Sequence, residues 1–275
     1  MLSISRRLAR IAKRRIRRLH LRYFNRIHLE PLQEAVRDVV PQDTKGLFVH
    51  SSLGSCGYFL GGCEMIVRTL RERADDLCMP THTYCYPTDE NAIPPIFDPH
   101  ETPSLVGALT DCFWKMDGVL RSLHPTHSVA AIGPLAPFLI AGHELCDTPC
   151  GDGTPYKKMI DADFSVLMLG ATLNAYTFFH TAEHDARVPY LYFPKPYDLR
   201  VRDPSNREIT VRMLRQNMTV PRRFAAMDKE LEAEGLLRRA PLGCGEILCI
   251  MSSKSAHEFL VETLRHDPYH LVHRR

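Results

Sequence analysis

The 275-residue chain is 44% hydrophobic and 24% charged, which is typical of a globular protein and excludes a disordered, collagen-like or coiled-coil chain. Its length suits one large domain or two average ones, and no apolar run is long enough to span a membrane. The net charge of +3 is unevenly distributed along the chain, because residues 1–29 hold ten of the 35 basic residues and none of the 32 acidic ones. The rest of the chain is therefore acidic, and we expect no nucleic-acid partner.

The nine cysteines are odd in number and form no CxxC pair. This pattern favours reduced thiols and a cytoplasmic location over a disulfide framework. The cysteines and the 14 histidines also lack the tight spacing of zinc ligands, so we expect no metal.

Residues 1–28 are predicted to form a basic amphipathic helical extension. Ile4, Leu8, Ile11 and Leu19 follow helical spacing, and arginines cover the remaining faces. Such a helix can pack on the body of the protein, or it can make peripheral contact with an anionic membrane surface at the inner face of the membrane. Targeting and nucleic-acid roles are weaker alternatives.

Residues 29–275 are predicted to form one α/β domain with a mixed central sheet flanked by helices. The expected elements of the first half are a helix at 29–40, a strand at 46–50, a glycine-rich turn at 51–62, a helix at 64–73, a strand at 77–79, a proline-rich irregular segment at 80–103 and a helix at 104–116 capped by Ser104. Those of the second half are strands at 128–132 and 164–170, a helix from 174 to 184, a less regular excursion at 195–235, short strands at 236–251 and a helix at 255–264.

Three segments could carry chemistry. The sequence from Val49 to Gly62 takes a strand into a glycine-rich turn and then a helix, an arrangement whose free N–H groups can bind an anion. The sequence RSLHPTHS at 121–128 offers His124 as a donor between a helix and a strand. His180 and Glu183 lie three residues apart on one helical face, as a general base and its orienting carboxylate would. Each segment has a plain structural explanation: a simple turn, a buried structural histidine and a charged surface helix.

Together the segments resemble the aminoglycoside 3-N-acetyltransferase family, which is unrelated to the GNAT acetyltransferases. The resemblance is carried by VHSSLGSCGYFLGG (49–62), MPTHT (79–83), FDPHETPS (97–104), RSLHPTHSVAAIG (121–133), AGH (141–143), MLG (168–170), HTAE (180–183) and the closing GLLRRAPLGCGEILCI (235–250). Seven matches in the same order cover roughly residues 35–190, so the resemblance is specific.

This resemblance implies acetyl transfer from acetyl-CoA to the amine of an aminoglycoside or a related amino sugar, by direct transfer in a ternary complex. It makes His180 the catalytic base, and we expect Glu183 to orient it. The residues on the CoA side would be His50, Ser51, Ser52, Leu53, Gly54, Gly61, Gly62, Ser104, Ser122, His124 and Ser128.

The sequence departs from the family after the catalytic helix, where a site for polycationic aminoglycosides should be acidic. Residues 200–223 instead hold seven arginines against two acidic residues, and Asp228 and Glu230 are the nearest candidates for the missing acid. We therefore expect segment 195–235 to lie on the acceptor side and consider a nucleotide-linked or lipid-linked amino sugar as an alternative acceptor. Two further alternatives are a non-catalytic CoA-binding relative and a hydrolase that uses Ser51 or Ser52, although the GxSxG motif is absent.

Overall fold

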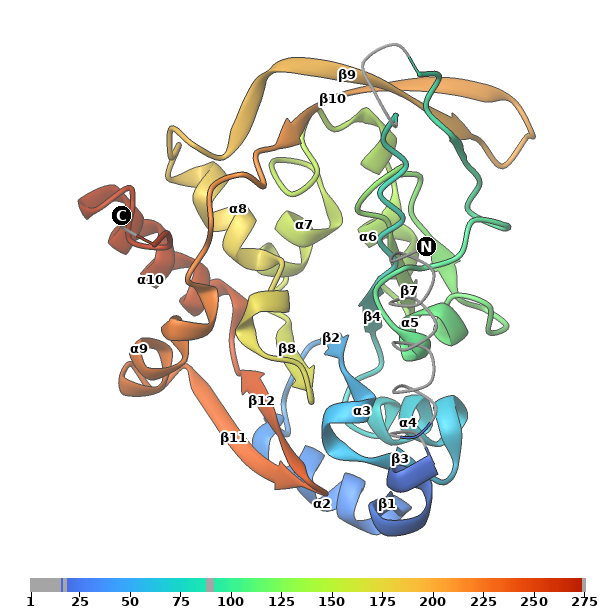
Figure 1. Cartoon of the computed structure of the whole chain (residues 1–275), viewed down its shortest axis with the longest axis vertical. Coiled ribbons are helices and arrows are strands. Elements are labelled where there is room, and N and C mark those ends of the chain that lie inside the picture. Colours follow the sequence, from blue (N-terminus) through green and yellow to red (C-terminus); the bar gives the residue numbers. More distant parts are fainter. Residues whose placement is uncertain (1–15, 17–18, 88–91, 274–275) are drawn as a thin grey trace, which may run out of the picture.

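The computed structural model describes residue 16, residues 19–87 and residues 92–273, and its main feature is a mixed sheet between two layers of helices (Figure 1). The strands in spatial order are β11 (Leu237–Leu242), β12 (Gly245–Ile250), β8 (Ser165–Leu169), β2 (Leu47–Ser51), β4 (Leu77–Pro80), β7 (Val129–Ile132) and β6 (Leu120–Arg121). The three central strands are parallel, and their neighbours on both sides are antiparallel. The predicted α/β class with a mixed central sheet is confirmed.

Side chains alternate between two cores along the central strands. Leu47 and Val49 of β2 pack into one core, while Phe48 between them packs into the other. In β8, Val166 and Leu167 divide between the same two cores in the same way. Both faces of these strands are buried, which explains why their sequences are continuously apolar.

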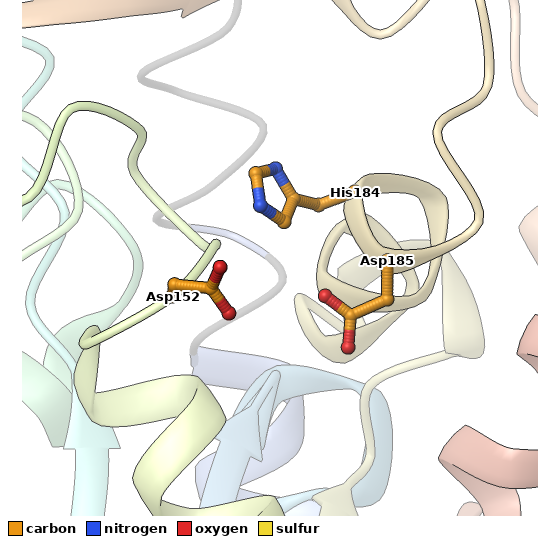
Figure 2. Close-up of side chains that lie close together, drawn as sticks. All are labelled: Asp152, His184 and Asp185. Carbon is orange, nitrogen blue, oxygen red and sulfur yellow. The ribbon is translucent and has the colours of Figure 1, made fainter.

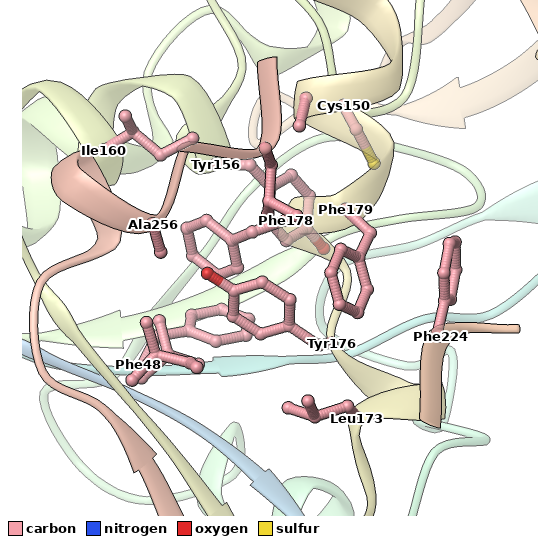
Figure 3. Close-up of a cluster of buried hydrophobic side chains, with 14 of the residues drawn as sticks. Phe48, Cys150, Tyr156, Ile160, Leu173, Tyr176, Phe178, Phe179, Phe224 and Ala256 are labelled. Atoms are coloured by element: carbon pink, nitrogen blue, oxygen red, sulfur yellow. The ribbon is translucent and has the colours of Figure 1, made fainter. Parts of the chain in front are cut away.

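Each core is closed by its own layer of helices. The first layer consists of α2 (Leu29–Val39), α4 (Gly62–Arg71) and α5 (Ala108–Phe113). The second layer consists of α6 (Ala136–Ile140), α7 (Pro155–Asp161), α8 (Phe178–Asp185), α9 (Asp228–Ala233) and α10 (Ser253–His266). Aromatic rings fill the second core, where Phe48, Tyr156 and Phe178 meet edge to face with centroids 5.2–5.8 Å apart (Figure 3). This rigid cluster supports the first turn of α8.

The predicted irregular excursion at 195–235 is wrong for its first half. β9 (Tyr192–Arg202) and β10 (Glu208–Gln216) form a long antiparallel hairpin (Figure 1). β5 (Ile96–Phe97) pairs in parallel with β9. Val201 and Val211 bury one face of this hairpin. The alternation is hard to see in the sequence because arginines and prolines occupy most of the other positions.

Two predicted helices begin later than expected. The helix predicted from Ser104 begins at Ala108, because Gly107 has φ 131°, which is not a helical conformation. Ser104 is therefore not its cap and instead donates its N–H to the side chain of Asp111. The helix predicted from residue 174 is a short 3₁₀ turn (Leu173–Ala175) followed by α8. The glycine-rich turn also contains regular structure, namely α3 (Leu53–Cys56) and β3 (Tyr58–Phe59).

The N-terminal segment joins the body before residue 29. β1 (Arg26–Ile27) pairs in parallel with β3, and Ile27 is buried in the first core, so the fold includes residues that we assigned to the extension. Residues 19–24 are helical, and Leu19, Tyr23 and Phe24 are exposed on them. The predicted stripe at Ile4, Leu8 and Ile11 lies outside the described residues. Within the described part of the chain, no helix combines the length and the apolar character needed to cross a bilayer.

Candidate active site

The centre of the site is a histidine held by a buried carboxylate. His180 lies in the first turn of α8, and its Nδ1 is 2.6 Å from Oε2 of Glu183. The other oxygen of Glu183 accepts a hydrogen bond from Nε of Arg222 at 3.1 Å. Glu183 is fully buried and Arg222 is nearly so, which makes this a three-residue chain running from the protein interior to His180.

The charges of Glu183 and Arg222 determine which ring nitrogen of His180 carries the proton. Burial alone would raise the pKa of Glu183, but the hydrogen bond from His180 and the guanidinium of Arg222 outweigh it and lower the pKa. The ionised carboxylate can only accept, so Nδ1 of His180 must carry a proton. Its Nε2 is then the nitrogen available to accept a proton from a bound molecule. Sequence reasoning paired His180 with Glu183, and the structure brings them together.

His180 forms part of the wall of a cavity of about 430 Å³, a size common for small-molecule sites. The cavity is lined by His50, Ser51, Pro80, His82, Tyr84, Tyr86, Val106, His127, Asn174, Ala175, Tyr176, Thr177, His180, Arg215, Gln216 and Met218. The set is drawn from the ends of β2, β4 and β10, the segments after β4, β8 and β10, the start of α8, and the loops that hold Val106 and His127. Several strand ends thus converge where α/β sheets place their ligands.

The described lining carries little negative charge. It includes no aspartate or glutamate, and its one arginine is Arg215. Burial lowers the pKa of His50 and His127 to about 3, and burial with neighbouring histidines lowers the pKa of His82 as well, so these rings are neutral. Asp228 and Glu230, the nearest sequence candidates for an acidic acceptor residue, lie in α9, outside this lining. Glu230 instead pairs with Arg223.

Five of the eleven residues predicted on the CoA side line one of two cavities. His50 and Ser51 line the cavity beside His180, and His50 Nε2 accepts a hydrogen bond from the backbone N–H of Thr177. Leu53, Gly54 and Gly62 line a second cavity of about 510 Å³, whose other walls include residues of β3 and α5. The segment from Ser51 to Gly54 therefore connects the two spaces. Ser52 bonds Ser55 just beyond this segment, and Gly61 precedes α4, where an added Cβ would collide with Met65.

The other four predicted CoA residues are buried and bonded internally. Ser104 bonds Thr110, and Ser128 donates to the backbone oxygen of Thr81. Nδ1 of His124 accepts the backbone N–H of His127.

Ser122 bonds Nδ1 of His143 at 2.8 Å and also borders a separate cavity of about 960 Å³ beside Arg121. Neither Ser122 nor the three residues Ser104, His124 and Ser128 lines the cavity beside His180. Their side chains hold the loops of the site in place.

Sequence reasoning missed several lining residues. His82 lies within the MPTHT motif, where it bonds the hydroxyl of Tyr156 at 2.8 Å, but we gave it no role. Tyr84 and Tyr86 follow it in a proline-rich segment that carries no periodic signal. Arg222 entered the sequence analysis only as one of the seven arginines at 200–223, and nothing in the sequence indicates that it contacts Glu183 from 39 positions away.

One group among the described residues has the ligand types of a metal site, namely Asp152, His184 and Asp185 (Figure 2). Asp185 already accepts hydrogen bonds from Lys157 at 2.6 Å and His257 at 2.8 Å, and His184 bonds the hydroxyl of Tyr192. The lysine ammonium already supplies a positive charge to Asp185. The group therefore fits an ion-pair network better than a metal centre, and the absence of a metal stays a prediction.

Residues 48–265 match the family model described as aminoglycoside 3-N-acetyltransferase. The match covers most of the chain. The chain belongs to the aminoglycoside 3-N-acetyltransferase family. The resemblance seen in the sequence motifs is confirmed.

Curated relatives of the chain are named aminoglycoside N(3)-acetyltransferases. A type III protein from Salmonella sp is 32% identical over 58% of this chain and 60% of its own length. A type IV protein from Salmonella sp is 31% identical over 72% of each chain. The match to the type III relatives thus spans less than two thirds of their length.

Solved structures share the fold. The apoenzyme of aminoglycoside acetyltransferase AAC(3)-IVa superposes with a TM-score of 0.73 at 26% identity, covering 90% of this chain and 92% of that one. A complex of the same enzyme with apramycin has a TM-score of 0.71 and also 26% identity. The structure titled AAC-IIIb binary with CoASH reaches a TM-score of 0.76 at 23% identity and is evidence for the fold alone.

Proposed function

We propose that this protein is an acetyl-CoA-dependent N-acetyltransferase that acylates an amino group of an aminoglycoside or a related amino sugar, with His180 as general base. The observation that carries the proposal is the chain from Arg222 through Glu183 to His180, which ends at the wall of a ligand-sized cavity. The names of the relatives support the reaction class, and the apramycin complex of a related enzyme supports an amine acceptor of this kind.

The proposed reaction is a direct transfer. An amine is protonated near neutral pH and has no lone pair in that form, so the neutral amine must be present before its nitrogen attacks the thioester carbonyl, and the attacking nitrogen then has a further proton to lose. Nε2 of His180 takes that proton, because Nδ1 is held by Glu183. The new C–N bond forms, the C–S bond breaks, and the thiolate of CoA leaves and takes a proton from the imidazolium of His180, which restores the neutral ring. The buried carboxylate stabilises the imidazolium that forms in between.

The two cavities bordered by the segment from Ser51 to Gly54 suit a long, narrow co-substrate. Ser51 and Val106 line the cavity beside His180, while Gly54 and Ala108 line the neighbouring one. Gly107 lies between them, and a Cβ there would approach the backbone oxygen of Ser51. We assign the acetyl end of acetyl-CoA to the first cavity and the remainder to the path along residues 51–54. Ser104, Ser122, His124 and Ser128 would then support this path through their internal hydrogen bonds.

The experiment that tests the proposal is acetyl-CoA turnover by thiol release with a panel of amines. His180→Ala should lower turnover by about 10²–10⁴-fold while leaving the melting temperature close to that of the wild type. His184→Ala is the matched control, because His184 lies on the same helix, bonds Tyr192 and does not line the cavity. Undiminished turnover in His180→Ala would contradict the proposed role, and turnover without any amine would favour a hydrolase.

Peripheral membrane contact remains a separate proposal about the N-terminal segment. Leu19, Tyr23 and Phe24 are exposed and lie beside basic residues, a combination that suits an anionic lipid surface. Co-sedimentation with vesicles of anionic and neutral lipids tests it, and a chain lacking residues 1–24 should lose the binding. A cytoplasmic location at the inner face of the membrane is the corresponding expectation.

A further inference from the structure

The arginine-rich segment after the catalytic helix contains one arginine unlike the others. Six of the seven arginines between positions 200 and 223 have a carboxylate partner: Arg200 with Glu208, Arg202 with Asp98, Arg207 with Asp203, Arg212 with Asp198, Arg222 with Glu183 and Arg223 with Glu230. Arg215 is the seventh, and within the described ranges 19–87 and 92–273 no carboxylate lies at ion-pair distance from it. It is also the one arginine in the described lining of the cavity beside His180.

Arg215 is held by aromatic rings, which leave its charge in place. Its guanidinium carbon lies 4.6 Å from the ring centroid of Tyr86 and 5.7 Å from that of Tyr197. The two tyrosines pack against each other edge to face, and Tyr86 also lines the cavity. The side chain is therefore positioned at the end of β10 with its full positive charge and its N–H donors available to a ligand.

The remaining described lining contains no negative charge to balance this arginine. The cavity walls hold neutral histidines, tyrosines, amides and hydroxyls, together with His180. A polycationic acceptor would be repelled by Arg215 and would find no carboxylate on these walls. An acceptor with an oxyanion group would instead find the planar, multi-donor partner that phosphates and carboxylates prefer.

We propose that Arg215 is the anion-binding residue of the acceptor site, and that the preferred acceptor is an amino compound carrying a phosphate or a similar oxyanion group. This rests on the proposed acetyl transfer at His180. The amino group would lie at His180 and the oxyanion at Arg215, since both side chains line the same cavity.

Matched acceptors test this directly. Glucosamine and glucosamine 6-phosphate differ by one phosphate, and a nucleotide-linked amino sugar, muramic acid and kanamycin extend the panel to a nucleotide, a carboxylate and a polycation. The variants are Arg215→Ala and Arg215→Lys, with Arg212→Ala as the control, because Arg212 is an exposed residue of the same strand and lies outside the cavity. Steady-state constants are measured for both the acceptor and acetyl-CoA.

We expect kcat/KM to be at least tenfold higher for the phosphorylated acceptor than for its unphosphorylated counterpart. Arg215→Ala should raise the KM of that acceptor at least tenfold, with kcat and the KM of acetyl-CoA within about twofold of the wild type. Arg215→Lys should restore part of the loss, and Arg212→Ala should change neither constant. The rank order among sugar phosphate, nucleotide sugar and carboxylate then identifies the source of the oxyanion.

Three results would overturn the inference. Kanamycin could be the best acceptor with a KM unaffected by Arg215→Ala, no anionic amine could be used at all, or Arg215→Ala could raise the KM of acetyl-CoA instead, which would place the arginine at the CoA phosphates. In the first and third cases the proposed acetyl transfer would still stand, provided that turnover is lost in His180→Ala. A failure of the transfer proposal itself would show as no thiol release with any amine on the panel.

Discussion

Replacing Glu183 with glutamine removes the charge behind His180 while keeping the shape of the side chain. The carboxylate accepts from His180 at 2.6 Å and from Arg222 at 3.1 Å, and it is fully buried. A glutamine amide can present its NH₂ group to Nδ1 of His180, which would move the ring proton to Nε2 and block proton acceptance there. We therefore expect kcat to fall by about 10²–10⁴-fold, the usual contribution of a positioned general base.

The same change has a cost in stability that the structure bounds. Removing one partner of a buried ion pair costs about 3–5 kcal/mol. Arg222 also donates to the backbone oxygens of Asn217 at 2.8 Å and Val220 at 2.6 Å, so its guanidinium keeps two acceptors. We therefore expect a loss near the lower end, about 3 kcal/mol, in the free energy of unfolding.

Thiol release and urea denaturation measure the two effects separately. Arg222→Gln is the complementary variant, because it leaves Glu183 with His180 alone. The double variant should lose less stability than the sum of the single losses, since both charges are then gone. A Glu183→Gln enzyme with a kcat within threefold of the wild type and an unchanged free energy of unfolding would refute the reasoning.

Three further predictions concern acid stability, backbone strain and metals. Burial lowers the pKa of five histidines below the value each has in the unfolded chain, namely His50, His82, His124, His127 and His143. Below about pH 6.5 the unfolded chain takes up protons at these rings while the folded chain does not, so the free energy of unfolding is highest above that pH and decreases as the pH falls. Urea titrations at pH 7.5 and 5.5 should differ by on the order of 5 kcal/mol, and equal midpoints would contradict this. Gly133→Ala should cost about 2–4 kcal/mol in the same assay, because its φ is 133° and a Cβ would collide with Asp76, whereas Gly235→Ala, with φ 69° and open space, should cost about 1 kcal/mol. Dialysis against EDTA should leave kcat within about twofold of the value for the untreated enzyme. A loss of activity that Zn²⁺ or Mn²⁺ restores would assign a metal to the group around His184.

The sequence predicted best the features that depend on neighbouring residues. The continuous apolar runs of β2 and β8 mark buried central strands, and helical spacing alone predicts that His180 and Glu183 share a face. Both predictions are consistent with the structure because each depends on a few consecutive positions.

Features that depend on distant residues could not be predicted. Arg222 reaches Glu183 from a loop after the hairpin. Arg215 differs from the other six arginines because their carboxylate partners lie either across the hairpin or in other segments, and the pairing is decided only by the folded structure. The β9–β10 hairpin was missed because its outward positions carry arginine and proline. The helix predicted at Ser104 failed because the conformation of Gly107 overrides a plausible serine cap.

The most direct test of the account is the pH dependence of acetyl transfer to an amine, measured by thiol release for the wild type and for His180→Ala. The account predicts turnover that requires an amine and that falls by about 10²–10⁴-fold in the variant, with loss of the limb that reports proton acceptance by a histidine. Turnover in His180→Ala at the wild-type rate with the same pH profile would contradict it.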